Sequence, residues 1–243
     1  MTYKEIFDKC VSEQKRKENK YDIWVSFVLR PLSIVCTMPL IGRRIDPTDI
    51  TKLSVICCII GFFVMSIGSS LHYILFGWFF FFLWSLLDCI DGNVARCNNA
   101  CSKLGDLWDT TGGYTAMVLV YFSAGILAFK FADIHSIIPA HFFLIMGSAT
   151  SVMSIFPRLV MHKKKSSDIA SGAVKSISDK SNFSLSQIIA MNIVAPTGGL
   201  LLLYLISILF NYVNWFVIIY FVGNLLIMSF SLYKLLKKEN EGQ

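Results

Sequence analysis

The chain has 243 residues, of which 55% are hydrophobic and 16% charged, with a formal net charge of +6 at pH 7. So few charges on so apolar a chain exclude an ordinary soluble domain and indicate a bundle of membrane-spanning helices. Residues 1–22 are polar and charged and lack the apolar centre of a signal peptide, so we expect a cytosolic N-terminal segment.

The first apolar stretch, residues 23–41, contains Arg30 and Pro31 near its centre. A spanning helix would place that arginine in the middle of the bilayer, where a charge is costly. The sequence therefore predicts an interfacial amphipathic helix over residues 23–41 that lies along the membrane surface. We expect this helix to begin a single membrane domain that covers residues 23–243.

Further apolar stretches follow, each close to the roughly 20 residues that a helix needs to cross a bilayer. We expect six spans, at residues 50–70, 71–94, 105–129, 137–160, 185–209 and 212–233. The predicted fold class is therefore all-α integral membrane, with six transmembrane helices after the interfacial helix. With both termini inside, 21 of the 22 Lys and Arg residues lie on the cytoplasmic side and only Lys130 lies outside. This asymmetry predicts a protein of the cytoplasmic membrane whose loop after the second span faces the cytoplasm.

Three aspartates interrupt the apolar pattern where the second span ends and the third begins. Asp88 and Asp91 are three residues apart, so they share one face of a helix. Asp109 lies near the start of the next apolar segment, and a turn between the two helices would let all three carboxylates converge. Carboxylates at the end of an apolar helix are costly and usually functional. Three hard oxygen donors suit Mg²⁺ or Mn²⁺, with an anionic substrate as the remaining ligand.

The residues around these aspartates suit an anionic ligand. Gly92, Ala95 and Gly105 are small and leave room for the backbone to approach a ligand closely. Arg96 adds a fixed positive fork whose geometry matches phosphate. The pattern therefore predicts a site for a phosphorylated substrate at the cytoplasmic face.

The spacing D-x₂-D-G-x₂-A-R-x₈-G-x₃-D-x₃-D resembles the signature of the CDP-alcohol phosphotransferases, integral-membrane enzymes that make phospholipids and related phosphodiesters. The matching positions in this chain are Asp88, Asp91, Gly92, Ala95, Arg96, Gly105 and Asp109. Where the signature has a fourth aspartate, this chain has Gly113. The segment from Pro47 to Thr51 also resembles the family's Pro-Asn-x-x-Thr segment, without the asparagine.

The resemblance implies an enzyme that transfers a phospho-alcohol group from a CDP-alcohol donor to an acceptor and releases CMP, in phospholipid or glycan phosphodiester synthesis. It implies that Asp88, Asp91 and Asp109 bind Mg²⁺ or Mn²⁺. It also implies that Gly92, Ala95, Arg96 and Gly105 line the nucleotide. In members that accept phosphorylated inositol, a basic residue near the end of the fourth span binds the acceptor phosphate, which points to Arg158.

The implied partners are the CDP-alcohol donor, a lipid, alcohol or phosphate-bearing acceptor, membrane lipids and a second copy of the chain in a homodimer. We expect no nucleic-acid partner. We interpret the aromatic residues of the second span as packed or lipid-facing side chains and not as a platform on which bases stack.

In the family, the fourth aspartate helps to hold the second metal and is the favoured catalytic base. Because this chain has Gly113 at that position, the sequence does not identify its base. The acceptor could be anionic or acidic enough to need none. His162, Asp106 or a substrate phosphate could act instead, although Asp106 is roughly 10 Å from position 113 along the helix axis and favours a salt bridge or cap. Alternatively, the chain is a catalytically silent member that binds a CDP compound and serves as a regulatory or scaffold protein.

Overall fold

The computed structural model describes residues 2–11, 24–43, 45–132, 138–170 and 199–240. Every regular element in these ranges is helical, which confirms the all-α class for the described part of the chain. The chain divides into two compact units. The first comprises Met1–Ala116 with Lys180–Leu205, and the second comprises Met117–Asp179 with Ile206–Gln243.

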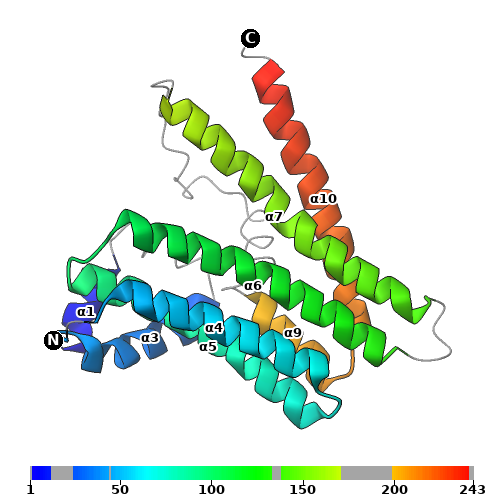
Figure 1. Ribbon diagram of the computed structural model, residues 1–243, viewed down its shortest axis with the longest axis horizontal. Coiled ribbons are helices and arrows are strands. Elements are labelled where there is room, and N and C mark those ends of the chain that lie inside the picture. Colours follow the sequence, from blue (N-terminus) through cyan, green and yellow to red (C-terminus); the bar gives the residue numbers. More distant parts are fainter. Residues whose placement is uncertain (1, 12–23, 44, 133–137, 171–198, 241–243) are drawn as a thin grey trace. The chain divides into compact units, whose positions relative to one another are not determined.

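Five helices of the described residues are long and apolar enough to cross a membrane (Figure 1). They are α4 (Pro47–Ile67), α5 (Leu71–Cys97), α6 (Lys103–Lys130), α7 (Ala140–Ala170) and α10 (Val213–Asn240). They correspond to five of the six expected spans. Most of the remaining one, at residues 185–209, falls outside the described residues, and α9 (Leu201–Leu209) covers its end. The count of six therefore stays a prediction.

The stretch expected to lie along the membrane is helical throughout its described part. It comprises a π-helix, η1 (Val25–Leu29), then α3 (Arg30–Thr37) and a short 3₁₀ turn, η2 (Met38–Leu40). Its outer face is apolar, since Phe27 is 79% exposed and Val35 is 54% exposed. An apolar outer face suits a helix that contacts lipid. Its position at a membrane surface stays a prediction.

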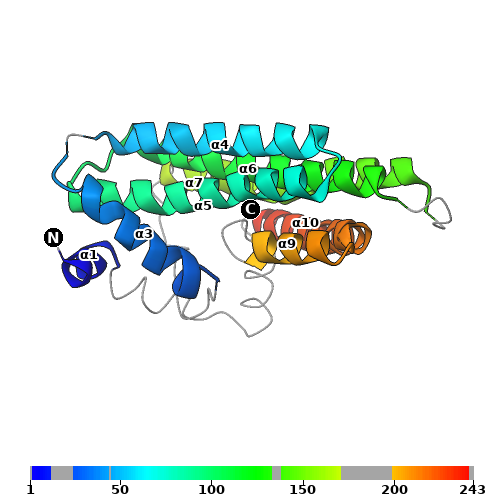
Figure 2. The same ribbon diagram turned by 90° about the horizontal axis from the view of Figure 1, so that it is seen from below.

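In the first unit, η1, α3 and the N-terminal helix α1 (Tyr3–Cys10) pack beside α5 (Figure 2). One apolar cluster joins η1 to α4 and α5 and contains Val25, Leu29, Ile50, Leu86, Ile90 and Val94. A second cluster joins α1 to α3 and α5 and contains Ile6, Cys10, Val11, Ile34 and Cys97. The C-terminal end of α5, where the signature lies, is thus covered by helices that precede the first span.

Helices α4 and α5 lie close together because two glycines face each other between them. A Cβ atom on Gly77 would lie 2.9 Å from the Gly61 carbonyl oxygen, and a Cβ on Gly61 would lie 2.8 Å from the Gly77 carbonyl oxygen. Real Cβ atoms do not approach a backbone oxygen so closely, so both positions require glycine at this helix separation. This contact sets the distance between the helix that carries Thr51 and the helix that carries Asp91.

The second unit uses the same device to join α6 and α7. A Cβ atom on Gly147 would lie 2.6 Å from the Gly125 Cα atom. Near this contact, the Ser151 hydroxyl of α7 donates a hydrogen bond of 2.9 Å to the Val118 carbonyl of α6. A hydroxyl that bonds a backbone carbonyl on a neighbouring helix is a common stabilising contact between small-residue faces in membranes.

The glycine contact between α4 and α5 gives a direct test of the packing in the first unit. Gly77→Ala should destabilise the protein by about 1–3 kcal/mol, the usual cost of overpacking, even though alanine is the better helix former. Gly223→Ala is the matched control, because a Cβ there would meet no described atom within 4 Å. Unfolding in SDS would be followed by circular dichroism. Equal stability of the two variants would contradict the close approach of α4 and α5.

Candidate active site

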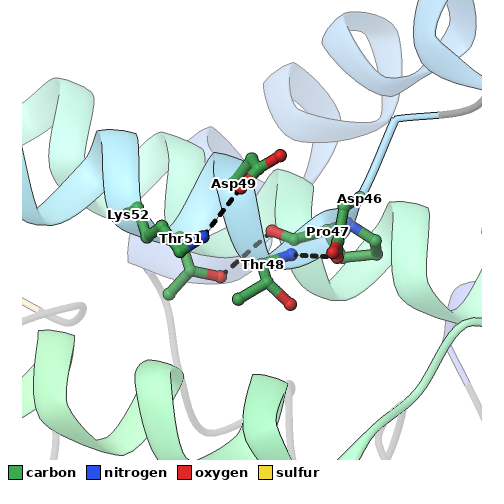
Figure 3. A network of polar contacts seen from close by, with 6 residues as sticks. All are labelled: Asp46, Pro47, Thr48, Asp49, Thr51 and Lys52. Atoms are coloured by element: carbon green, nitrogen blue, oxygen red, sulfur yellow. Dashed lines mark hydrogen bonds and ion pairs between the residues drawn. The ribbon is translucent and has the colours of Figure 1, made fainter.

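The site begins at the N-terminal end of α4, where the sequence Asp46-Pro47 starts the helix (Figure 3). The Asp46 carboxylate accepts a 2.9 Å hydrogen bond from the Thr48 backbone N–H, and Pro47 occupies the first turn, where its missing N–H costs nothing. The hydrogen bond from this N–H holds the pKa of the Asp46 carboxyl below its usual value. A capped first turn fixes the direction in which the side chains of Thr48 and Thr51 project from the helix.

The turn between α5 and α6 returns the chain to the same end of the bundle. Helix α5 ends with Asn99 in the left-handed conformation, at a φ of 52°, and the Ala100 N–H bonds the Ala95 carbonyl at 2.8 Å. This pattern is the Schellman end of a helix, with asparagine in the place usually taken by glycine. Helix α6 then begins where the Ser102 hydroxyl accepts a 3.0 Å bond from the Gly105 N–H.

This arrangement brings the signature aspartates of α5 and α6 within reach of one another. Asp91 is buried, at 5% exposure, Asp88 is half-buried, and Asp109 is exposed. The charge of Asp109 acts on the carboxyl groups of both Asp88 and Asp91. The expected turn between the two helices therefore places all three carboxylates at one end of the first unit.

Asp91 is held by a residue of α4. The Thr51 hydroxyl lies 2.5 Å from the Asp91 Oδ2 atom and 3.2 Å from the Pro47 carbonyl oxygen. Because a hydroxyl has one hydrogen and the contact with the carboxylate is shorter, the bond goes to Asp91. Thr51 is 3% exposed, so this donor stabilises a carboxylate that water hardly reaches. The sequence singled out Thr51 only as part of the Pro47–Thr51 segment, and its partner was not predicted.

Arg96 lies across the backbone of the signature glycine. A Cβ atom on Gly92 would lie 3.0 Å from Arg96 Nη2 and 3.2 Å from Nη1, so the guanidinium occupies the space that a side chain would take. Nη2 donates a 3.2 Å hydrogen bond to the Asn93 side-chain oxygen. The Nε atom is buried and has no hydrogen-bond partner among the described residues.

The other predicted binding residues fall in two places. Gly105 joins the site, since a Cβ there would lie 3.9 Å from the Thr48 hydroxyl of α4. Ala95 is half-buried on the last turn of α5. Arg158 and His162 are on α7 in the second unit, so they are not placed relative to the aspartates. Arg158 is half-buried and His162 is exposed.

Asp106 and Gly113 differ in their surroundings on α6. Asp106 is exposed in the first turn, where a negative charge favours the start of a helix. At Gly113, four residues after Asp109, an added Cβ would meet no described atom within 4 Å. The side of α6 that would carry the fourth signature aspartate is therefore open.

The three aspartates have the chemistry of ligands for a divalent metal ion, although their side chains are not grouped closely. Among the described residues, no three His, Cys, Asp or Glu side chains lie close enough together to hold a metal ion. Asp88 and Asp109 nevertheless lie close enough for their charges to interact, and a nearby cation would favour the ionised form of both. Hard carboxylate oxygens are the ligands that Mg²⁺ and Mn²⁺ prefer. The type of ligand therefore suits such an ion, and its binding by these three residues stays a prediction.

A comparison with protein families decides the identity of this fold. A model of the CDP-alcohol phosphatidyltransferase family matches residues 45–225, which includes α4, α5, α6 and the whole aspartate motif. The chain belongs to the CDP-alcohol phosphatidyltransferase family. This is a family of transferases that generally depend on a divalent metal, and together with the apolar helices it makes the protein an integral membrane protein. No curated protein sequence matches the chain.

The bond between Thr51 and Asp91 predicts a specific loss in this family member. Thr51→Val removes the hydroxyl and leaves a buried carboxylate oxygen without its donor, which should cost about 1–3 kcal/mol of unfolding free energy. Thr51→Ser keeps the hydroxyl and should cost less. Unfolding in SDS would measure both.

Thr150→Val is the matched control for this comparison. Thr150 is also buried, but its hydroxyl donates to the Met146 carbonyl of its own helix, at 2.7 Å. A carbonyl that keeps its helical partner loses little when the hydroxyl is removed. Equal costs for Thr51→Val and Thr150→Val would show that Thr51 does not support Asp91.

Proposed function

We propose that the protein transfers a phospho-alcohol group from a CDP-alcohol to an acceptor hydroxyl, with release of CMP. The observation that carries the proposal is the grouping of Asp88, Asp91 and Asp109 at one end of the first unit, in a chain of this family. An apolar helix would not retain buried carboxylates for stability alone, because each costs free energy unless it has donors or a cation.

In the proposed reaction, the acceptor oxygen attacks the β-phosphorus of the donor and the bond from that phosphorus to the CMP oxygen breaks. A divalent ion held by Asp88, Asp91 and Asp109 would neutralise the diphosphate and the leaving oxygen. The guanidinium of Arg96 would bind a diphosphate oxygen. Gly92, Ala95 and Gly105 would let the backbone come close to the nucleotide. Catalysis by such a site is mainly positioning and electrostatic stabilisation.

The surroundings of the site follow from the charge distribution of the chain. The excess of Lys and Arg on one side supports a site that faces the cytoplasm, where CTP-derived donors are made. Acceptors in phospholipid or glycan phosphodiester synthesis would reach it from the same side or from the lipid. Arg158 would bind an acceptor phosphate, and a homodimer in the membrane would be the working form.

Gly113 favours a second candidate, a family member that binds a CDP compound without turnover and acts in regulation or as a scaffold. Position 113 lies one turn after Asp109, and the space beside it is free of described atoms. A chain without a base there would need His162, Asp106, an anionic acceptor or a substrate phosphate to complete the reaction. The two candidates differ in one observable, the release of CMP.

Replacement of Gly113 tests both candidates. Gly113→Asp should raise CMP release with a simple alcohol or with water by about 10²-fold or more, since a general base typically contributes ~10²–10⁴-fold. With an anionic acceptor it should give no gain, because the new carboxylate repels a like charge. The measurement is CMP release from a panel of CDP-alcohols with alcohol, water and phosphate-bearing acceptors.

Gly113→Asn is the matched control, since it adds the same bulk without a base. If the native protein turns over a neutral alcohol rapidly, a base is already present, and His162→Asn and Asp106→Asn would identify it. If native protein and variants bind the donor but none releases CMP with any acceptor, the silent binder is the correct function.

A further inference from the structure

Asn93 occupies a variable position of the signature, between Gly92 and Ala95, and its side chain does not face the carboxylates. It is fully buried, at 0% exposure, where the last turns of α5 meet α3. Its amide nitrogen lies 3.1 Å from the Ser33 hydroxyl and 3.5 Å from the Thr37 hydroxyl. Its side-chain oxygen accepts the 3.2 Å bond from Arg96 Nη2. One buried side chain thus joins α3 to the signature arginine.

The hydrogen-bond directions in this group are fixed by its chemistry. The Thr37 hydroxyl donates to the Ser33 carbonyl at 2.6 Å, and the Ser33 hydroxyl donates to the Arg30 carbonyl at 2.9 Å. Both hydroxyl hydrogens are therefore used, and both oxygens accept from the Asn93 amide, which has two hydrogens to give. The amide oxygen must then point toward Arg96, which can only donate. An aspartate or leucine at this position could not make both sets of bonds.

Arg96 is held from two sides as a result. On one side the guanidinium lies over the Gly92 backbone, where an added Cβ atom would be 3.0 Å from Nη2. On the other side the Asn93 side-chain oxygen accepts a hydrogen bond from Nη2. The buried Nε atom has no described partner. A guanidinium whose plane is fixed is suited to a diphosphate, because binding then orders few further rotamers.

The support for Asn93 comes from a part of the chain that the family match does not include. Helices α1 and α3 precede residue 45, where the match begins. In α1, the Cys10 thiol lies 3.5 Å from the Asn93 carbonyl oxygen, and the Lys9 ammonium bonds the Cys97 carbonyl at 2.6 Å. The Lys9 contact gives a donor to a carbonyl at the end of α5, and both contacts hold α1 against that end of the helix.

We propose that Asn93 is a positioning residue that fixes the Arg96 guanidinium for the diphosphate of the donor, and that α3 sets its orientation through Ser33 and Thr37. This inference rests on the proposed function, because it takes a CDP compound as the ligand of Arg96. The helix before the first span thereby acts in substrate binding as well as in contact with the membrane. Asn93 acts through Arg96 and does not touch the ligand itself.

The test is a double-mutant cycle on the full chain in phosphatidylcholine nanodiscs, with CDP as the probe and cytidine as the neutral comparison. Asn93→Ala should weaken CDP binding about 10- to 100-fold, the effect of one hydrogen bond to a charged group, and should leave the weak binding of cytidine unchanged. In an Arg96→Ala background, the same substitution should change CDP affinity by no more than about twofold. A residue with a purely structural role would give the same loss in both backgrounds.

Two further comparisons separate positioning from folding. Asn224→Ala removes another buried asparagine, whose amide bonds the Tyr220 carbonyl at 2.8 Å in the second unit, and should leave CDP affinity unchanged. If Asn93→Ala does not fold, the double variant Ser33→Ala with Thr37→Val tests the same claim from α3 and should weaken CDP binding. The single variant Thr37→Ser keeps the hydroxyl and should leave CDP binding at the native level.

The outcomes distinguish this inference from the proposed function. Native protein that binds CDP, with losses at Asn93 that add to the loss at Arg96, would overturn the positioning role and leave the function standing. Native protein that binds CDP no better than cytidine would overturn both. Coupled losses, with cytidine unaffected, support the assignment.

Discussion

A carboxylate buried at the end of a membrane helix must be given hydrogen-bond donors or a cation, and the first unit is built around that requirement. Asp91 is 5% exposed and accepts a 2.5 Å hydrogen bond from the Thr51 hydroxyl of α4. Asp88 instead meets another acidic group, Asp109, across the turn to α6. The bond from Thr51 gives Asp91 a donor within the protein. The contact between Asp88 and Asp109 brings two acidic groups together, so it favours a positively charged partner.

Two helices keep these groups in place from different sides of α5. On the α4 side, Gly61 and Gly77 allow the backbones to approach, so that Thr51 reaches Asp91. On the α3 side, the apolar cluster that contains Ile34 and Cys97 and the buried amide of Asn93 hold the last turns of α5. The acidic residues and the basic residue of the motif are therefore supported by separate contacts. Substitutions in one set should leave the other largely intact, since distant sites usually act independently.

Much of this arrangement could be read from the sequence because long apolar runs and single interruptions are strong signals. A helix covers the predicted second span, the start of α4 moves from residue 50 to Pro47 because Asp46 caps it, and the shared site of Asp88, Asp91 and Asp109 stays a prediction. The partners of Thr51 and Asn93 were not predicted, because contacts between helices depend on their rotation and separation. No local pattern encodes the distance between Gly61 and Gly77 either. Arg158 was predicted from the family resemblance and His162 from its place one turn further along the chain, and their relation to the aspartates stays a prediction.

The central claim is that the aspartates of α5 and α6 hold a CDP compound through a divalent cation. The most direct measurement is the affinity of the full chain for a CDP-alcohol in nanodiscs, with Mn²⁺ and with EDTA, for the native protein and Asp91→Asn. The account predicts that EDTA weakens binding by native protein about tenfold or more, and that Asp91→Asn binds weakly under both conditions, since a neutral amide is a poor ligand for a hard cation. Native affinity that is the same in Mn²⁺ and in EDTA would contradict it.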